Sequence, residues 1–146
     1  LNYAALLHDI GWIEGEKGHH MATLRIILNT PLLHFTNKER LMIGSIARYH
    51  RRALPDKTHD HYSALSTREQ GLVSELGGML RIADALDTTH LRRVQDITCD
   101  VRPRKVVLHC KVKKAAPDEK KMVQEKGDLF TQIFERTLSL TWKFSP

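Results

Sequence analysis

Residues 4–11 have the sequence AALLHDIG, an apolar run that ends in an adjacent histidine and aspartate followed by a glycine. Apolar side chains recur around this run at helical spacing, at Tyr3, Leu6, Leu7 and Ile10. Gly11 stands where a helix commonly ends. Because an imidazole and a carboxylate side by side at a helix end can both face one metal ion, the stretch predicts a helix that ends at Gly11, with His8 and Asp9 as candidate metal ligands.

Further residues of metal-binding type follow on predicted helices. His19 and His20 open the next predicted helix, and His50 ends the one after it. Asp84 lies in an apolar part of a long helix predicted over residues 68–92. Imidazole nitrogens and carboxylate oxygens are ligands of the divalent metals that act on phosphates. These residues are therefore candidates for the same metal site as the His-Asp pair.

Two of these candidates have a second interpretation that the sequence leaves open. A carboxylate buried without a partner costs several kcal/mol, so Asp84 is either a metal ligand or salt-bridged to Arg81 or Arg48. His50 at a helix end is explained equally by the helix dipole. Its basic neighbours favour a phosphate-contacting edge instead, because guanidinium groups pair bidentately with phosphate oxygens: Arg48, Arg51 and Arg52.

Local signals predict where the other helices begin. Thr36 with Glu39, and Ser66 with Glu69, have the spacing of capping boxes, so each pair predicts a helix N-terminus. Residues 51–63, rich in His, Asp and Lys, are predicted to form a loop between these helices.

A period-2 pattern replaces the helical one after the long helix. Two half-buried strands are predicted around the turn at residues 102–105, in a register that sets Cys99 opposite Leu108 and Cys110 opposite Ile97. The two cysteines are thus diagonal neighbours and are predicted to be small buried groups without a disulfide. A helix beginning at Pro117 and a last strand over residues 138–142 complete the pattern.

The sequence therefore predicts an α+β fold, mainly α, in which a helical bundle is followed by a small β-β-α-β unit. We expect a helical domain over residues 1–93, and a subdomain over residues 94–146 packed on it. The chain starts at Leu1 as if within a helix, so we expect it to be part of a longer protein.

Composition indicates the class of partner. The 146 residues carry a formal net charge of +6, which favours polyanions such as phosphate chains or nucleic acid. No apolar run approaches the roughly 20 residues of a membrane span, so no membrane partner is expected. With two cysteines there is no disulfide framework, which favours reduced thiols and a cytoplasmic location.

The ordered set of His-Asp, His, His and Asp resembles the HD superfamily of metal-dependent phosphohydrolases, and the resemblance implies an HD-domain bundle. In that superfamily the second histidine precedes a small residue by four positions, which here is Thr23 and favours His19 over His20. The implied ligands of one or two divalent ions (Mg, Mn, Fe or Zn) are His8, Asp9, His19, His50 and Asp84. A further histidine is implied upstream of Leu1, so this chain alone is not expected to be a fully competent enzyme.

More closely, the chain is similar to the C-terminal region of the Ppx/GppA family of exopolyphosphatases and guanosine pentaphosphate phosphohydrolases. The similarity rests on residues 4–11, the pair His19-His20, and the segments 46–52 (IARYHRR), 80–87 (LRIADALD) and 125–130 (EKGDLF). Met21-Ala22 stands where family members often have a further histidine.

This resemblance implies a phosphoanhydride hydrolase whose preceding actin-like portion carries the chemistry. The HD-like part would then bind polyphosphate or guanosine pentaphosphate and help to build a homodimer. Two other functions stay open at this point. One is an autonomous metal-dependent phosphohydrolase, and the other is a non-catalytic module that binds nucleic acid or protein.

Overall fold

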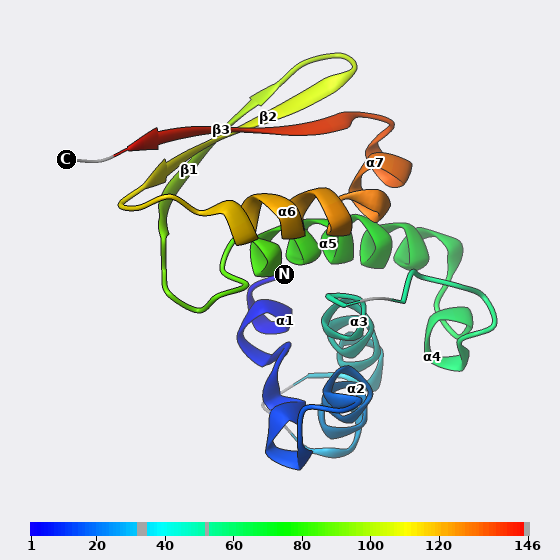
Figure 1. Ribbon diagram of the computed structural model, residues 1–146. Coiled ribbons are helices and arrows are strands. Elements are labelled where there is room, and N and C mark those ends of the chain that lie inside the picture. The colour runs from blue at the N-terminus through cyan, green and yellow to red at the C-terminus, as the bar shows by residue number, and fades with distance from the viewer. Residues whose placement is uncertain (32–34, 52, 145–146) are drawn as a thin grey trace. The chain divides into compact units, whose positions relative to one another are not determined.

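The computed structural model describes residues 1–31, 35–51 and 53–144, and its contacts divide the chain into two units, Leu1–Leu80 and Arg81–Pro146. Over the described residues it has seven α-helices, one 3-10 helix and three strands (Figure 1). The predicted α+β, mainly α fold is therefore confirmed. The predicted domain boundary between residues 93 and 94 stays a prediction.

The first unit is helical. Its elements are α1 (Asn2–Leu7), the 3-10 helix η1 (Ile10–Glu14), α2 (His19–Asn29), α3 (Asn37–Arg48), α4 (Asp60–Ser63) and the first part of α5 (Thr67–Ala85). Helix α2 packs against both α3 and η1, and α1 packs against α3. The core of the unit is formed by buried side chains that include Ala4, Ile27, Ala47, Tyr49 and Val73.

Both predicted capping boxes are present and set the starts of the two longest helices. The Thr36 side chain accepts a hydrogen bond from the Glu39 backbone at the start of α3, and Glu39 accepts one from the Thr36 backbone in return. Ser66 and Glu69 exchange the same pair of bonds before α5. Lys38 on α3 lies 2.7 Å from the second carboxylate oxygen of Glu69, so this cap also joins two helices.

The Glu69 carboxylate makes the stability of the folded protein depend on pH. Hydrogen bonds from Lys38 and Ser66 lower the pKa of Glu69 from 4.5 to about 2. A lowered pKa in the folded state gives stability that is present above pH 4.5 and is lost as the pH falls towards 2. We expect the melting temperature of Glu69→Gln to fall less than that of the wild type across this window. Parallel acid dependences measured by circular dichroism would contradict the assignment.

The first helix is shorter than predicted. Helix α1 ends at Leu7, and Ile10–Glu14 continues as a 3-10 helix. Only part of the apolar stripe predicted here is buried: Leu7 packs against the core, whereas Leu6 is 79% and Tyr3 47% exposed. The helix stops because α2 supplies other partners to the following backbone: Thr23 Oγ1 donates to the His8 carbonyl and accepts from the Gly11 amide.

Two further predicted element boundaries were wrong. Residues 51–63 contain the short helix α4 (Asp60–Ser63), whose Tyr62 enters the core. Helix α5 ends at Ala85 instead of residue 92. Beyond it Asp87 accepts from the Arg92 amide, and Arg92 has a positive φ of 49°, so the chain turns before the strand begins.

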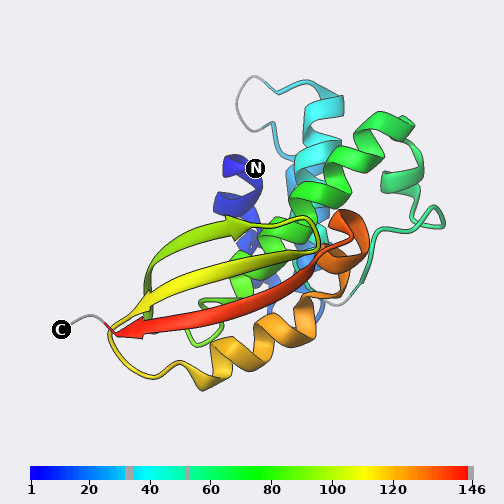
Figure 2. The same cartoon turned by 90° about the horizontal axis from the view of Figure 1, so that it is seen from above.

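The second unit contains a three-stranded sheet and two short helices. Its elements after α5 are β1 (Val94–Val101), β2 (Lys105–Val112), α6 (Pro117–Lys126), α7 (Asp128–Phe134) and β3 (Thr137–Phe144). Strand β2 lies in the middle, antiparallel to β1 and parallel to β3 (Figure 2). Side chains of the sheet and helices form a core that includes Ile82, Leu86, Leu108, Cys110 and Val123.

The single helix predicted after Pro117 is broken into α6 and α7 at Gly127. Arg81 explains the break, because this buried side chain contacts both sides of it. Its Nε donates to the Lys126 carbonyl at 3.3 Å, and its Nη2 pairs with Asp128 at 2.8 Å.

The hairpin register agrees with the prediction. Cys99 lies opposite Leu108 and Ile97 opposite Cys110, and both cysteines are free thiols. Cys110 is buried, but Cys99 is exposed, which corrects the prediction that both are buried. The correction extends to neighbouring residues of β1: Val101 is 66% and Ile97 40% exposed, although the residues of β2 opposite them are buried.

Candidate metal and phosphate site

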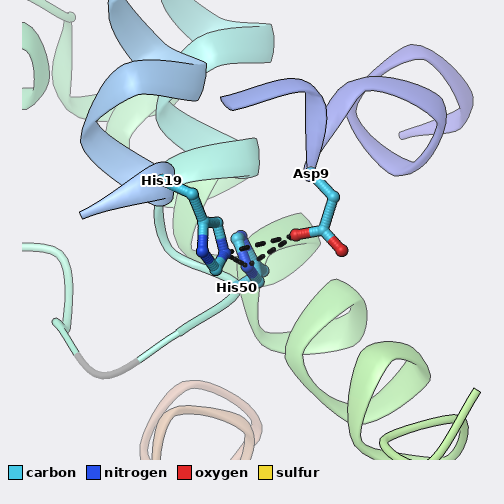
Figure 3. A group of neighbouring side chains, drawn as sticks. All are labelled: Asp9, His19 and His50. Carbon is cyan, nitrogen blue, oxygen red and sulfur yellow. Dashed lines mark hydrogen bonds and ion pairs between the residues drawn. The ribbon is translucent and has the colours of Figure 1, made fainter. Parts of the chain in front are cut away.

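Three side chains from separate elements meet in the first unit. Asp9 precedes η1, His19 is the first residue of α2, and His50 follows the end of α3. Their donor atoms converge (Figure 3): Asp9 Oδ1 lies 3.3 Å from His19 Nε2 and 3.4 Å from His50 Nε2, and the two Nε2 atoms are 3.2 Å apart. Both histidines are 2% exposed, whereas Asp9 is partly exposed. We call these residues the triad.

The backbone orients both histidine rings. His19 Nδ1 contacts the Glu16 carbonyl at 3.0 Å, and His50 Nδ1 contacts the Ala47 carbonyl at 2.6 Å. A carbonyl oxygen only accepts, so the hydrogen of each ring is on Nδ1. Each Nε2 faces the centre of the triad and is an acceptor when its ring is neutral. A second ring nitrogen bonded to a carbonyl is the usual arrangement of metal-binding histidines.

Three ligand atoms this close to one another suit a bound cation. The two Nε2 lone pairs and the Asp9 carboxylate oxygen all lie within 4.8 Å of one another. Their mutual repulsion in a buried site is relieved when a positive charge lies among them. Two imidazoles and a carboxylate are also a ligand set that suits zinc, iron and other divalent metals. The residues present therefore fit a divalent metal ion.

Asp9 is ionised in this surrounding. Burial raises the pKa of its carboxyl, but the hydrogen bond from His8 and the charges of His8, His50 and His19 lower it to about 2. A carboxylate must be deprotonated to bind a metal, so Asp9 is ready to do so throughout the physiological pH range.

The fourth predicted ligand of this region, His8, lies beside the triad. Its Nε2 is 3.4 Å from Asp9 Oδ2, the carboxylate oxygen that faces away from the other two histidines, and its ring meets that of His50 edge to face. Its Nδ1 contacts the Ala5 carbonyl at 2.7 Å. His8 therefore repeats the orientation of the two triad histidines.

Gly11 lets the segment carrying Asp9 approach α2. A Cβ added at this position would lie 2.0 Å from the His19 carbonyl oxygen and 2.6 Å from the Thr23 amide nitrogen. The glycine was predicted as a helix end, but the structure gives it another role, because it permits close contact between two backbones.

Trp12 is a site residue that sequence reasoning missed. Its ring stacks on His19, with centroids 5.0 Å apart and planes inclined by 25°. It shields one face of the His19 ring from water. Its only signal in the sequence is its position three residues after Asp9.

The adjacent histidines 19 and 20 are separated by the structure. His19 enters the triad, while His20 Nδ1 is buried without a hydrogen-bond partner among the described residues. Burial and the nearby charges of Arg48, His19 and Arg51 lower the pKa of His20. With Lys17 and Arg51, this histidine lines a cavity of about 390 Å³.

One of the three predicted phosphate-contacting arginines contacts the triad, and a second packs beside Met21 and over the Tyr49 ring. Arg51 Nη1 is 3.3 Å from His19 Nδ1. Arg48 is 7% exposed, its Nε contacts the Met21 sulfur, and its Nη1 has no hydrogen-bond partner within the described part of the chain. A buried guanidinium with an unsatisfied donor favours an anion. Arg52 lies outside the described residues.

Asp84 lies in the second unit, where Lys126 forms an ion pair with its carboxylate. Arg81, one of the two salt-bridge partners considered from the sequence, also lies in this unit and pairs with Asp128. The role of Asp84 as a metal ligand stays a prediction.

Within the described residues, no helix is long and apolar enough to cross a membrane. A family model described as Ppx/GppA phosphatase, domain III, matches residues 1–129, which include the triad, Arg48 and Arg51. This match covers most of the chain and agrees with the segments that suggested the resemblance. The chain belongs to the Ppx/GppA phosphatase family.

Proposed function

We propose that this chain is the part of an exopolyphosphatase-type phosphohydrolase that holds its phosphate-chain substrate, polyphosphate or guanosine pentaphosphate. The observation that carries the proposal is the placement of Arg51 beside a triad that fits a divalent metal. A metal ion and a neighbouring arginine can each contact a different phosphate group along a linear anion. Family membership supports the same class of substrate.

Each residue has a distinct task in this proposal. Asp9, His19 and His50 hold a divalent ion. His8 contacts and orients Asp9, and it is the candidate fourth ligand of the ion. The ion would stabilise negative charge on a phosphate oxygen. Arg51, which is partly exposed, contacts a second phosphate, and the Nη1 donor of buried Arg48 is available to an anion that enters beside Met21. Arg52 is proposed to extend the same basic edge.

The triad also favours a second candidate function, an autonomous metal-dependent phosphohydrolase. In that function the substrate is cut at this site, whereas in the first it is only held here. We further propose that an actin-like portion and a second copy of the chain are partners, and that the protein acts in the cytoplasm.

Replacing Arg51 with alanine distinguishes a specific contact between Arg51 and phosphate from the general effect of losing one positive charge. We expect the dissociation constant for polyphosphate to rise about tenfold or more, because a charge-assisted bond contributes about 1.5–3 kcal/mol. The matched control is Arg25→Ala, which removes an exposed arginine of α2 that is already paired with Glu14. Titration calorimetry at two salt concentrations measures the effect. Equal losses in both variants would mean that only net charge matters.

The two candidate functions predict different results when the Asp9 carboxylate of the triad is removed. If the site only holds substrate, Asp9→Ala loses the contact made through the metal but retains the salt-sensitive part of polyphosphate binding that Arg51→Ala weakens. If the site is catalytic, the wild type releases phosphate and Asp9→Ala does not. A chain that binds neither polyphosphate nor metal would contradict both.

A further inference from the structure

Trp12 lies on the same side of its segment as the triad carboxylate. Its amide donates a hydrogen bond to the Asp9 carbonyl at 2.9 Å, one 3-10 turn earlier. Because side chains three residues apart in such a turn share one side, the indole and the carboxylate point the same way. Both reach His19: Asp9 Oδ1 lies 3.3 Å from its Nε2, and the indole stacks on its ring.

This side of the triad is also the one that is open to solvent. The side chains of His19 and His50 are 2% exposed, whereas that of Asp9 is 33% exposed. Figure 3 shows Asp9 approaching the two histidines from a separate segment of the chain. Trp12 follows on that segment and is 46% exposed. A ligand that reaches the triad past Asp9 therefore meets the indole.

Packing alone does not explain why this indole is exposed. A tryptophan that is buried contributes a large apolar area to stability, but Trp12 is not among the core side chains of the described residues. Shielding of His19 uses one face of the indole. The outward face is a flat aromatic surface next to a site that fits a metal and phosphate.

We propose that Trp12 binds the base of a purine nucleoside polyphosphate, which stacks on the outward face of the indole. The ribose separates the base from its phosphate groups, which then reach the triad and Arg51, both in contact with His19. This inference rests on the proposed function and narrows it. Inorganic polyphosphate has no aromatic ring, so Trp12 favours the nucleotide over the phosphate chain.

The chemistry of stacking defines the class of ligand. Every base has an aromatic face, so stacking on a single side chain tolerates changes of base. A purine covers more of an indole than a pyrimidine does, because it has two fused rings. Trp12 therefore selects for nucleotides, and for purines among them, without reading the hydrogen-bonding edge of the base.

Two ligands that each carry three phosphate groups separate the base contact from the phosphate contacts. Guanosine triphosphate and inorganic tripolyphosphate are titrated by calorimetry into the wild type and Trp12→Leu. We expect Trp12→Leu to raise the dissociation constant of guanosine triphosphate about tenfold, because stacking is lost, and to leave that of tripolyphosphate unchanged. Trp12→Phe keeps an aromatic ring and should have a smaller effect.

The matched control is Ile13→Ala. Ile13 is the next residue of η1 and is 83% exposed, so this variant removes an exposed apolar side chain and should bind both ligands as the wild type does. If Trp12→Leu weakens both ligands equally, or neither, Trp12 does not bind the base, and the proposed function stands without it. If the wild type binds neither ligand, the proposed function fails, and this inference fails with it.

Fluorescence tests the stacking directly. The chain has two tryptophans, so Trp142→Phe leaves Trp12 as the only indole. We expect guanosine triphosphate to quench its emission over the concentrations at which calorimetry shows binding, and tripolyphosphate to leave it unchanged. Trp12→Phe retains Trp142, which lies in the second unit, and should show no quenching. Binding of guanosine triphosphate without quenching of Trp12 would overturn the inference.

Discussion

Replacing Asp9 with alanine is expected to lower the affinity of the purified protein for zinc by about 100-fold or more. The wild type, prepared without chelator, should contain close to one divalent transition metal per chain. The carboxylate is the only anionic ligand of the triad, and without it two neutral imidazoles remain. Elemental analysis gives the metal content, and titration of the metal-stripped protein with zinc chloride gives the affinity.

Two variants control for this result. Asp9→Asn keeps the size of the side chain but loses its charge, so it should also bind zinc weakly. Asp56→Ala removes an exposed carboxylate of the same unit that accepts hydrogen bonds from Thr58, and it should bind zinc as the wild type does. If metal content is the same in all four proteins, the triad is not the metal site, and the second candidate function loses its support.

Gly11→Ala is expected to destabilise the first unit by about 3 kcal/mol, at the upper end of what overpacked positions usually show. The added methyl group would lie 2.0 Å from the His19 carbonyl oxygen, so the segment and α2 must move apart. That movement also separates Asp9 from His19. We therefore expect lower stability in urea denaturation together with weaker zinc binding.

Another glycine of the same unit provides the control for this substitution. A methyl group added at Gly71 in α5 would meet no other atom within 4 Å, and alanine is favoured over glycine in a helix. Gly71→Ala should therefore leave zinc binding unchanged and stability equal or slightly higher. A Gly11→Ala protein as stable as the wild type would mean that the two backbones approach less closely than described.

Sequence reasoning predicted the elements that depend on local signals. The capping boxes at Thr36 and Ser66 and the register of Cys99 opposite Leu108 are fixed by residues close together in the chain. The wrong boundaries depend on distant partners. Thr23 ends α1 and Arg81 breaks the helix at Gly127, and neither contact leaves a pattern in the local sequence.

The same distinction applies to the site. Residue type and order identified Asp9, His19 and His50, but only the fold shows that their donor atoms meet. The stacking of Trp12 on His19 requires a turn that periodicity cannot reveal. The exposure of Cys99 could not be predicted either, because an alternating pattern gives the inward face of a strand but not whether another element covers it.

The orientation of the histidine rings has an evolutionary consequence. The groups that accept their Nδ1 hydrogens are main-chain carbonyls, each three residues earlier in the chain, at Ala5, Glu16 and Ala47. Every amino acid supplies such a carbonyl, so the side chains at these positions can change without losing the acceptor. The geometry of the ligands is thus tolerant of mutation around them and sensitive only to changes that displace the backbone itself.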